Sequence, residues 1–496
     1  MTRTLAPLLA ALVAGLVALG ARAAATGAAQ ETPAMPAAPP AAPPAAASAA
    51  PAPLAPPPAN LVLVTLDTTR ADHLGCYGYA RPTTPSLDAF AAESLLFERC
   101  YAPVPHTTPS HTSLFTGVFP YEHGVVACSF RADERVQEQR AFVPSERLRA
   151  YPQILADHGY ATGGFVTAAT TKRVTGLAAG FTAWGEPSGE VRPGSEALAE
   201  ALAWLETAPQ PFFLWLHLFD AHAPPREKNS KHVGKFAADA ALRDHLAARR
   251  ISGQPGTIER EFALYDAGLR LMDDHFRDLR AALETKGAWA NSVVVVTGDH
   301  GEGLWQHGER THGTVWNEQL HVPLLLRVPG RAPERVPTLL SLIDVLPTAV
   351  GAANGALPAD ELLLQARGRP ALDEAFEESA VFSMSPPKRG EHSLTTARYK
   401  LIRRKSGDHD LYDLESDPHE LCDLSAEQPE LFAKLDAQLR HSISEQKRRH
   451  AWYYDGADLA DDLSPEERER LRKELEAIGY AEGEGDDGAE SGDGGR

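Results

Sequence analysis

Cysteine is scarce in this chain of 496 residues, and its scarcity excludes two classes of protein. The chain has only Cys76, Cys100, Cys128 and Cys422, which are too few for a disulfide-dense scaffold. Their spacing contains no C-x-x-C pair or related pattern, so the sequence predicts no thiolate zinc site. We expect them to be buried apolar residues or, in an exported protein, to form one or two disulfides.

Positive charge is also in short supply. The chain has 48 Lys and Arg residues against 67 Asp and Glu residues, which gives a formal net charge of −19. Proteins that bind nucleic acid need clustered cations to displace counterions from phosphates, so no nucleic-acid partner is expected. Hydrophobic residues make up 43% of the chain and charged residues 23%, as in an ordinary globular protein.

Long apolar runs are missing except at the N-terminus. Arg3 precedes an uncharged stretch over 5–20, and Ala21-Arg22-Ala23 offers a small-x-small cleavage site. This pattern predicts a signal peptide over 1–23 and an exported protein, periplasmic or extracellular. The alternative is an uncleaved segment that tethers the protein to the cell envelope, because the run approaches the ~17 residues of a short membrane span.

Composition divides the rest of the chain into four parts. Residues 33–58 contain 11 Pro and 12 Ala, so no amphipathic face can form, and we read 24–59 as an extended linker. Gly, Asp and Glu dominate residues 479–496, which we expect to be a disordered acidic tail. Between them we expect a catalytic domain over 60–350, then a smaller C-terminal subdomain with a helix over 351–478.

Three short apolar runs, 61–66, 212–219 and 293–296, are rich in β-branched or aromatic residues. Such runs are typical of strands buried on both faces of a parallel sheet. Helical patterns over 85–98, 148–158 and 195–207 separate them. The fold class predicted is α/β, with a doubly wound, mostly parallel sheet and a C-terminal α+β subdomain.

Polar side chains follow all three predicted strands: Asp67 after the first, Asp220 and His222 after the second, Asp299 and His300 after the third. Ligands of open α/β sheets bind beyond the carboxyl ends of strands, so we expect these side chains to share one site. Each of them alone could equally cap a helix or accept a loop hydrogen bond. Carboxylates with imidazole suit one divalent ion, Ca²⁺, Mn²⁺ or Zn²⁺.

The segment 105–117 reads as a loop that enters a helix, with Pro109 at the first helical position. The free amides at such an end bind anions. Thr107 or Thr108, placed just before the helix and next to a cation, could attack an ester of phosphorus or sulfur. Either hydroxyl could instead simply cap the helix.

Ordered motifs along 60–424 resemble the sulfatase family of the alkaline-phosphatase superfamily. They include Asp67-Thr68-Thr69-Arg70, Thr107-Thr108-Pro109-Ser110-His111, Thr297-Gly298-Asp299-His300-Gly301 and Ser341-Leu342-Ile343-Asp344. The resemblance implies an alkaline-phosphatase-like fold and a hydrolase that acts on small-molecule, glycan or lipid esters.

The resemblance also implies roles for single residues. It makes Asp67, Asp299, His300 and Thr107 the metal ligands, with Thr107 as the nucleophile. His222 and His312 match positions that contact the anionic group or protonate the leaving oxygen. His111 and Arg70 would help to hold the anion.

The chain departs from the usual sulfatase pattern at several of these positions. Thr107 replaces the Cys or Ser that is converted to formylglycine, and Thr68 replaces a second metal carboxylate. His111 and His312 replace the usual Arg and Lys, and Thr167 stands where a cationic pair is usual. A threonine must form a covalent ester, as in related phosphodiesterases and phospho-group transferases, so Thr107 favours phosphate over sulfate.

Two other readings remain. One is a cell-envelope phospho-group transferase, and the other is a pseudoenzyme that binds anionic glycans. We expect two further histidines to have structural roles. His217 lies inside a predicted strand and should be a buried, hydrogen-bonded core residue, and His307 should be part of a loop.

Overall fold

A computed structural model describes residues 59–128, 141–222, 225–254, 256–353, 367–373, 376, 380–455 and 473, without the side chains of 225–230. The expected signal peptide, the acidic tail and nearly all of the linker lie outside these residues. The described residues belong to one compact unit, Pro56–Arg496.

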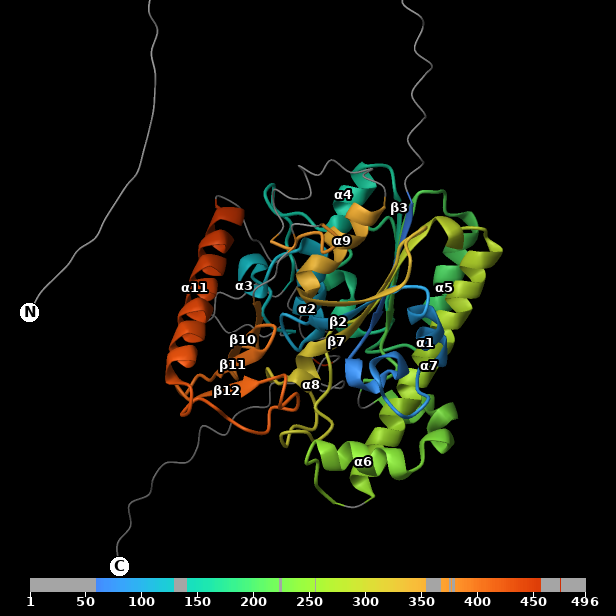
Figure 1. Cartoon of the computed structure of the whole chain (residues 1–496). Coiled ribbons are helices and arrows are strands. Elements are labelled where there is room, and N and C mark those ends of the chain that lie inside the picture. The colour runs from blue at the N-terminus through green and yellow to red at the C-terminus, as the bar shows by residue number, and fades with distance from the viewer. Residues whose placement is uncertain are drawn as a thin grey trace, which may run out of the picture. The chain divides into compact units, whose positions relative to one another are not determined.

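An eight-stranded sheet forms the centre of this unit, in the order β4-β3-β5-β1-β6-β7-β2-β8 (Figure 1). β1 pairs in parallel with both β5 and β6, so the three strands predicted from the sequence are neighbours in the middle of the sheet. Only β7 runs antiparallel to its neighbours, β6 and β2. The strands are β1 Asn60–Leu66, β2 Leu95–Tyr101, β3 Ala161–Phe165, β4 Ala183–Gly185, β5 Phe212–Leu218, β6 Ser292–Gly298, β7 His321–Arg327 and β8 Glu334–Ser341.

Helices cover both faces of the sheet, because alternate side chains of β1 pack into two different hydrophobic clusters. Leu61 and Leu63 pack in a cluster with residues of α2, α4 and α9, whereas Val62 and Val64 pack with residues of α1, α5 and α7. The helices are α1 Pro85–Ala91, α2 Thr107–Thr116, α3 Pro120–His123, α4 Tyr151–Asp157, α5 Gly194–Thr207, α6 Ala240–Ala248, α7 Thr257–Thr285, α8 Asn317–Leu320 and α9 Val345–Ala352. The predicted α/β fold class is confirmed.

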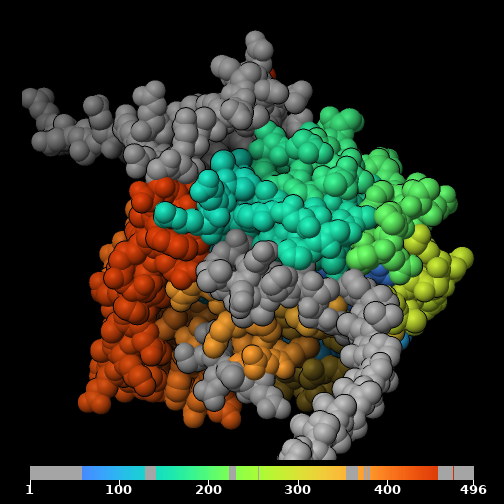
Figure 2. Space-filling model, turned by 90° about the horizontal axis from the view of Figure 1, so that it is seen from above, coloured from blue at the N-terminus to red at the C-terminus, as the bar shows by residue number. Residues whose placement is uncertain are grey.

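A four-stranded antiparallel sheet, in the order β12-β11-β10-β9, forms the C-terminal subdomain with the long helix α11. The elements are β9 Val381–Met384, β10 His392–Thr395, β11 Tyr399–Arg403, β12 His409–Asp413 and α11 Pro429–Tyr453. Figure 2 shows α11, in red, beside the teal segment that begins near residue 141. Ser145 Oγ donates to the carbonyl of Tyr453 at 2.8 Å, and Arg147 donates to the carbonyl of Trp452 at 2.7 Å.

A buried ion pair within this subdomain binds the larger domain through hydrogen bonds to Asn317. Lys400 Nζ lies 2.7 Å from Glu420 Oε1, and both side chains are fully buried. Lys400 also donates to Asn317 Oδ1 at 2.8 Å, and Glu420 Oε2 accepts from the backbone N–H of Asn317 at 2.7 Å. His307 lies 2.9 Å from Glu318 Oε1 and 3.1 Å from the carbonyl of Glu420. The structural reading of His307 therefore agrees with its contacts.

Two local predictions were wrong. The helix expected over 85–98 ends at Ala91, and Leu95–Tyr101 forms β2, because Leu95, Leu96 and Phe97 pair with both β7 and β8. Helix α2 begins at Thr107 itself, so Pro109 is its third residue and not its first.

The four cysteines are free thiols in the structure, and of the described helices none is long and apolar enough to cross a membrane.

Candidate active site

The central strands deliver three potential metal ligands to one point. Asp67 follows β1, whereas Asp299 and His300 follow β6, its parallel neighbour. One ligand atom from each of the three lies within 4.8 Å of the others, and all three side chains are fully buried. The strand-end argument made from the sequence therefore describes a real cluster of side chains.

In both Asp67 and Asp299, one carboxylate oxygen accepts hydrogen bonds and the other has no hydrogen-bond partner. Asp299 Oδ1 accepts from the backbone N–H groups of Thr68 at 3.1 Å and His300 at 2.8 Å. Asp67 Oδ2 accepts from the hydroxyl of Thr107 at 3.2 Å, with Nε2 of His217 at 3.1 Å. Asp67 Oδ1 and Asp299 Oδ2 are buried without a hydrogen-bond partner. Buried carboxylate oxygens need a partner, and a divalent cation fits both.

His300 presents a nitrogen lone pair to the same point. Its Nδ1 lies 2.9 Å from the carbonyl of Gly301, which can only accept, so Nδ1 carries the proton. Nε2 is therefore unprotonated, and it lies 3.4 Å from Thr107 Oγ1. A side chain at Gly301 would meet the carbonyl of Glu318, which packs directly against it. Two oxygens and one nitrogen make a donor set that fits Ca²⁺, Mn²⁺ or Zn²⁺.

Thr107 is the first residue of α2, and its hydroxyl points at the cluster. The residue before it, His106, provides no side-chain cap, and the Thr107 hydroxyl donates to Asp67. Thr108 Oγ1 donates instead to the carbonyl of Thr170 at 2.6 Å. The alternative that either threonine simply caps the helix is therefore wrong.

Burial controls the electrostatics of the two carboxylates. Loss of water raises the pKa of Asp67 well above its usual value, although the hydrogen bond from Thr107 opposes this. Burial and then the charge of Asp67 raise the pKa of Asp299 in the same direction. The pair therefore resists carrying two negative charges unless a cation lies between them.

This electrostatic strain predicts a pH dependence of stability in the metal-free protein. Above the ordinary carboxyl pKa of about 4, the unfolded chain has lost protons that the folded pair still holds. Stability then falls as pH rises from about 4 through the raised folded pKa values. We expect the thermal midpoint of chelator-treated protein to fall over this range and a divalent metal to restore it.

The matched control is Asp299→Asn, which removes one of the two charges. Buried histidines such as His217, whose pKa burial lowers to about 3, contribute the opposite slope. The informative quantity is therefore the difference in midpoint between wild type and Asp299→Asn. Parallel curves for the two proteins would contradict the raised pKa of the pair.

His111 and His217 support the cluster from within the protein. His111 Nδ1 lies 2.8 Å from the carbonyl of Thr107 and therefore donates, which leaves Nε2 to accept from Thr65 at 3.0 Å. Trp215 Nε1 in turn donates to Thr65 Oγ1 at 2.9 Å. Both ring nitrogens of His111 are thus engaged inside the protein, which makes it a residue that positions Thr107.

His217 is a contributor that the sequence reading assigned only to the core. Its ring is fully buried, with Nε2 facing Asp67 and Nδ1 3.1 Å from Thr167 Oγ1. His217 pairs with Thr65 in the register of β5 and β1, two residues before Asp67. Knowledge of this strand register would have predicted that His217 lies next to Asp67. Such an outer partner orients a ligating carboxylate.

His222 and His312 form a hydrogen-bonded pair, with their Nε2 atoms 3.1 Å apart. His312 Nδ1 lies 2.9 Å from the carbonyl of Pro105 and carries a proton, so its Nε2 accepts and His222 Nε2–H donates. The His312 ring centroid is 4.4 Å from that of His300, and the His222 ring stacks on Phe219. The structure therefore places this pair beside the metal candidates.

Arg70 and Asp220 have other partners. The guanidinium of Arg70 donates to both carboxylate oxygens of Asp72 and to Gln306 Oε1. It also lines a cavity of about 580 Å³ whose described lining does not include Thr107 or the three ligand candidates. Asp220 Oδ1 accepts from the N–H of Gly194 at the start of α5.

Thr68, which stands where the usual sulfatase pattern has a second metal carboxylate, has a strained backbone conformation. Thr68 has φ of +52°, a left-handed conformation that is rare for a β-branched residue. Its N–H thereby reaches Asp299, and its carbonyl accepts from Tyr265 at 2.8 Å. The local backbone thus fixes Asp299 through Thr68, while the Thr68 side chain adds no negative charge.

A comparison with protein families identifies the family of this chain. The family model described as Sulfatase matches residues 59–356, and the chain belongs to that family. The suspected family is thereby confirmed.

Curated relatives are distant. The ulvan-active sulfatase of Formosa agariphila is 24% identical over 79% of this chain and 82% of its own length. Arylsulfatase K of Rattus norvegicus is 27% identical, but the match covers 49% of this chain and about half, 51%, of that relative.

Solved structures share the fold. A putative sulfatase from Bacteroides fragilis has a TM-score of 0.67 and 19% identity, covering 81% of this chain and 99% of that one. The phosphonate monoester hydrolase of Agrobacterium radiobacter has a TM-score of 0.60 and 19% identity, covering 78% and 96% respectively.

Proposed function

We propose that this protein is an exported, metal-dependent hydrolase of sulfate or phosphate esters in which Thr107 is the nucleophile. The observation that carries the proposal is the position of the Thr107 hydroxyl. Its oxygen lies 3.2 Å from Asp67 Oδ2 and 3.4 Å from His300 Nε2, next to two of the three proposed metal ligands. A hydroxyl beside both a proton acceptor and a cation site can be activated as a nucleophile.

The threonine favours a phosphate ester over a sulfate ester. In the usual sulfatases, formylglycine hydrate expels sulfate by regenerating an aldehyde, a route that a plain hydroxyl lacks. Thr107 must instead form an ester that water hydrolyses in a second step. The similar fold of the phosphonate monoester hydrolase supports phosphorus chemistry on this scaffold.

The residues of the site divide the proton transfers between them. Asp67 Oδ2 accepts the proton of the Thr107 hydroxyl as Oγ1 attacks. The bond from phosphorus or sulfur to the leaving oxygen breaks as His222, doubly protonated as imidazolium, gives a proton to that oxygen and becomes a neutral imidazole. A bound divalent cation would lower the pKa of the hydroxyl and neutralise a non-bridging substrate oxygen.

The second step reverses these roles. The neutral His222 takes a proton from the water that attacks the Thr107 ester and becomes imidazolium again, and Asp67 returns its proton to Thr107 Oγ1. In the resting site, His312 Nε2 accepts the hydrogen bond of His222, and the carbonyl of Pro105 fixes the orientation of the His312 ring. Arg70, held by Asp72 and Gln306, has no part in these transfers.

A panel of aryl esters tests the function. The full-length protein is assayed with an aryl sulfate, an aryl phosphate monoester and an aryl phosphodiester, with and without chelator, and an acid-quenched sample is searched for esterified Thr107 by mass spectrometry. We expect chelator-sensitive turnover, fastest with a phosphoester, and a modified Thr107. Turnover of the sulfate alone would overturn the preference for phosphate. No turnover by metal-loaded protein would favour the transferase or the pseudoenzyme.

The natural substrate class that we propose is a glycan or lipid ester of the cell exterior. The name of the ulvan-active relative supports a polysaccharide ester. Export rests on the pattern over 1–23, which lies outside the described residues.

A further inference from the structure

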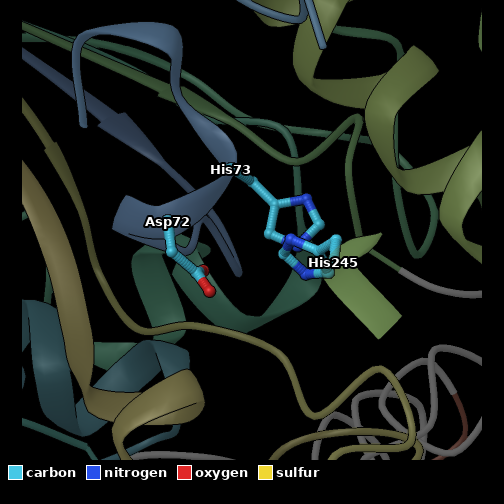
Figure 3. A group of neighbouring side chains, drawn as sticks. All are labelled: Asp72, His73 and His245. Atoms are coloured by element: carbon cyan, nitrogen blue, oxygen red, sulfur yellow. The ribbon is translucent and has the colours of Figure 1, made fainter. Parts of the chain in front are cut away.

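A second group of potential metal ligands lies outside the Thr107 site (Figure 3). Asp72 and His73 belong to the short turn Ala71–His73 after β1, and His245 belongs to α6. One ligand atom from each lies within 4.8 Å of the others. Figure 3 shows the two imidazole rings next to each other, with the carboxylate of Asp72 beside them. We propose that these three residues form a second metal site, which binds a transition-metal ion such as Zn²⁺.

The hydrogen bonds of His73 prepare one nitrogen for a metal. Its Nδ1 lies 3.1 Å from Asp266 Oδ1 and donates to that carboxylate. Asp266 Oδ2 also accepts from the hydroxyl of Tyr79 at 3.0 Å and from the guanidinium of Arg81, and these two donors favour the carboxylate form of Asp266. His73 Nε2 is consequently an unprotonated lone pair. A carboxylate behind a histidine in this way is the usual outer support of a metal-bound imidazole.

Two buried nitrogens lack partners at this place. His73 Nε2 and His245 Nε2 are both buried with no hydrogen-bond partner, and the side chains are 0% and 8% exposed. The two ring centroids are 4.8 Å apart. Aromatic rings surround them, with Tyr79 4.4 Å and Tyr265 5.0 Å from the His73 ring. Buried polar atoms are rarely left without a partner, and one ion would satisfy both nitrogens.

The positive charges around Asp72 determine which class of metal ion the site favours. Asp72 accepts from Arg70 Nε at 2.8 Å and from Arg249 NH2 at 2.8 Å, and these two charges lower the pKa of Asp72 although the carboxylate is partly buried. Arg81 lies beyond Asp266 and adds a third positive charge. Hard ions such as Ca²⁺ need several carboxylates and are disfavoured here. An ion that bonds well to imidazole, such as Zn²⁺, depends less on negative charge.

The second site is accessible and independent of the first. The side chain of Asp72 is 31% exposed, which gives a metal ion a route from solvent. The site shares no residue with the cluster of Asp67, Asp299 and His300. The proposal therefore stands whether or not the esterase function is correct.

Metal stoichiometry of four full-length proteins tests the second site. The four proteins are wild type, Asp299→Asn, His245→Gln and the double variant. Each is stripped of metal with chelator and dialysed against Zn²⁺, and its bound zinc is then measured by elemental mass spectrometry. We expect two equivalents of Zn²⁺ per chain in wild type, one in Asp299→Asn, one in His245→Gln and none in the double variant. In His245→Gln the Zn²⁺ affinity of the second site should fall by about 100-fold or more. An unchanged metal content in His245→Gln would overturn the proposal.

Two controls keep the result interpretable. His441→Gln changes a histidine whose side chain is 74% exposed on α11, and it should leave two equivalents bound. The Co²⁺ spectrum of Asp299→Asn, in which His73 and His245 are intact, decides the matter if His245→Gln does not fold. Absorption bands of imidazole-bound Co²⁺ support the second site, and their absence refutes it.

Discussion

Thr107→Ala is expected to lower kcat for any ester that the protein hydrolyses by about 10⁴-fold or more, because removing a nucleophile costs that order of magnitude. The hydroxyl donates to Asp67 at the start of α2, and alanine keeps the helix while leaving nothing to attack the ester. Metal content should stay within a few-fold, since Asp67, Asp299 and His300 remain. The measurement is kcat on the best ester of the panel together with metal analysis.

Thr107→Ser is the matched variant. It retains the hydroxyl at the same position and should keep activity within about 100-fold of wild type, with the covalent ester moved to the serine. Thr108→Ala controls for the neighbouring hydroxyl, which donates to Thr170 and not to the cluster. If Thr107→Ala kept wild-type activity while Thr108→Ala lost it, the nucleophile would be misassigned.

Asp299→Asn should weaken metal binding by at least about 100-fold and reduce activity to a comparable degree. The amide oxygen can still accept from Thr68 and His300, so the backbone there is preserved. The second oxygen, which has no hydrogen-bond partner, is exchanged for an NH₂ group that cannot bind a cation.

The same substitution should stabilise the metal-free protein. The charge of Asp67 raises the pKa of Asp299, which means that it disfavours a second negative charge there, and asparagine at position 299 removes that charge. Activity and apo-stability therefore change in opposite directions, as is usual where a site holds groups that favour function over folding. Thermal denaturation in chelator measures the gain. A lower midpoint than that of wild type would contradict the repulsion between the two carboxylates.

The central part of the fold could be predicted because its sequence pattern is strong. The runs at 61–66 and 293–296 are apolar except for Thr65, and parallel neighbours place Asp67 and Asp299 at one edge. The start of β2 could not be separated from the helix before it, since Leu95 to Phe97 continue an apolar pattern without a break. Only pairing with β7 and β8 makes that segment a strand.

The site was predictable to the extent that residues follow strand ends or stand in motifs. His217 escaped because its role depends on register between β5 and β1, which a single sequence does not contain. The orientation of His111 was also hidden, because its two hydrogen bonds go to a backbone carbonyl and to Thr65. The second cluster needs α6 to fold over the turn after β1, a contact between residues more than 170 positions apart.

The buried pair of Lys400 and Glu420 limits which part of this chain can be transferred to another protein by gene fusion or by engineering. The part of the chain that defines the family ends at residue 356, before either of them. Yet these two residues hold Asn317 and His307, in the segment between His300 and β7 that carries His312. A gene fusion or transplant that ended with the family-defining span would leave that segment without its support. The smallest unit that keeps these contacts therefore extends through the C-terminal sheet.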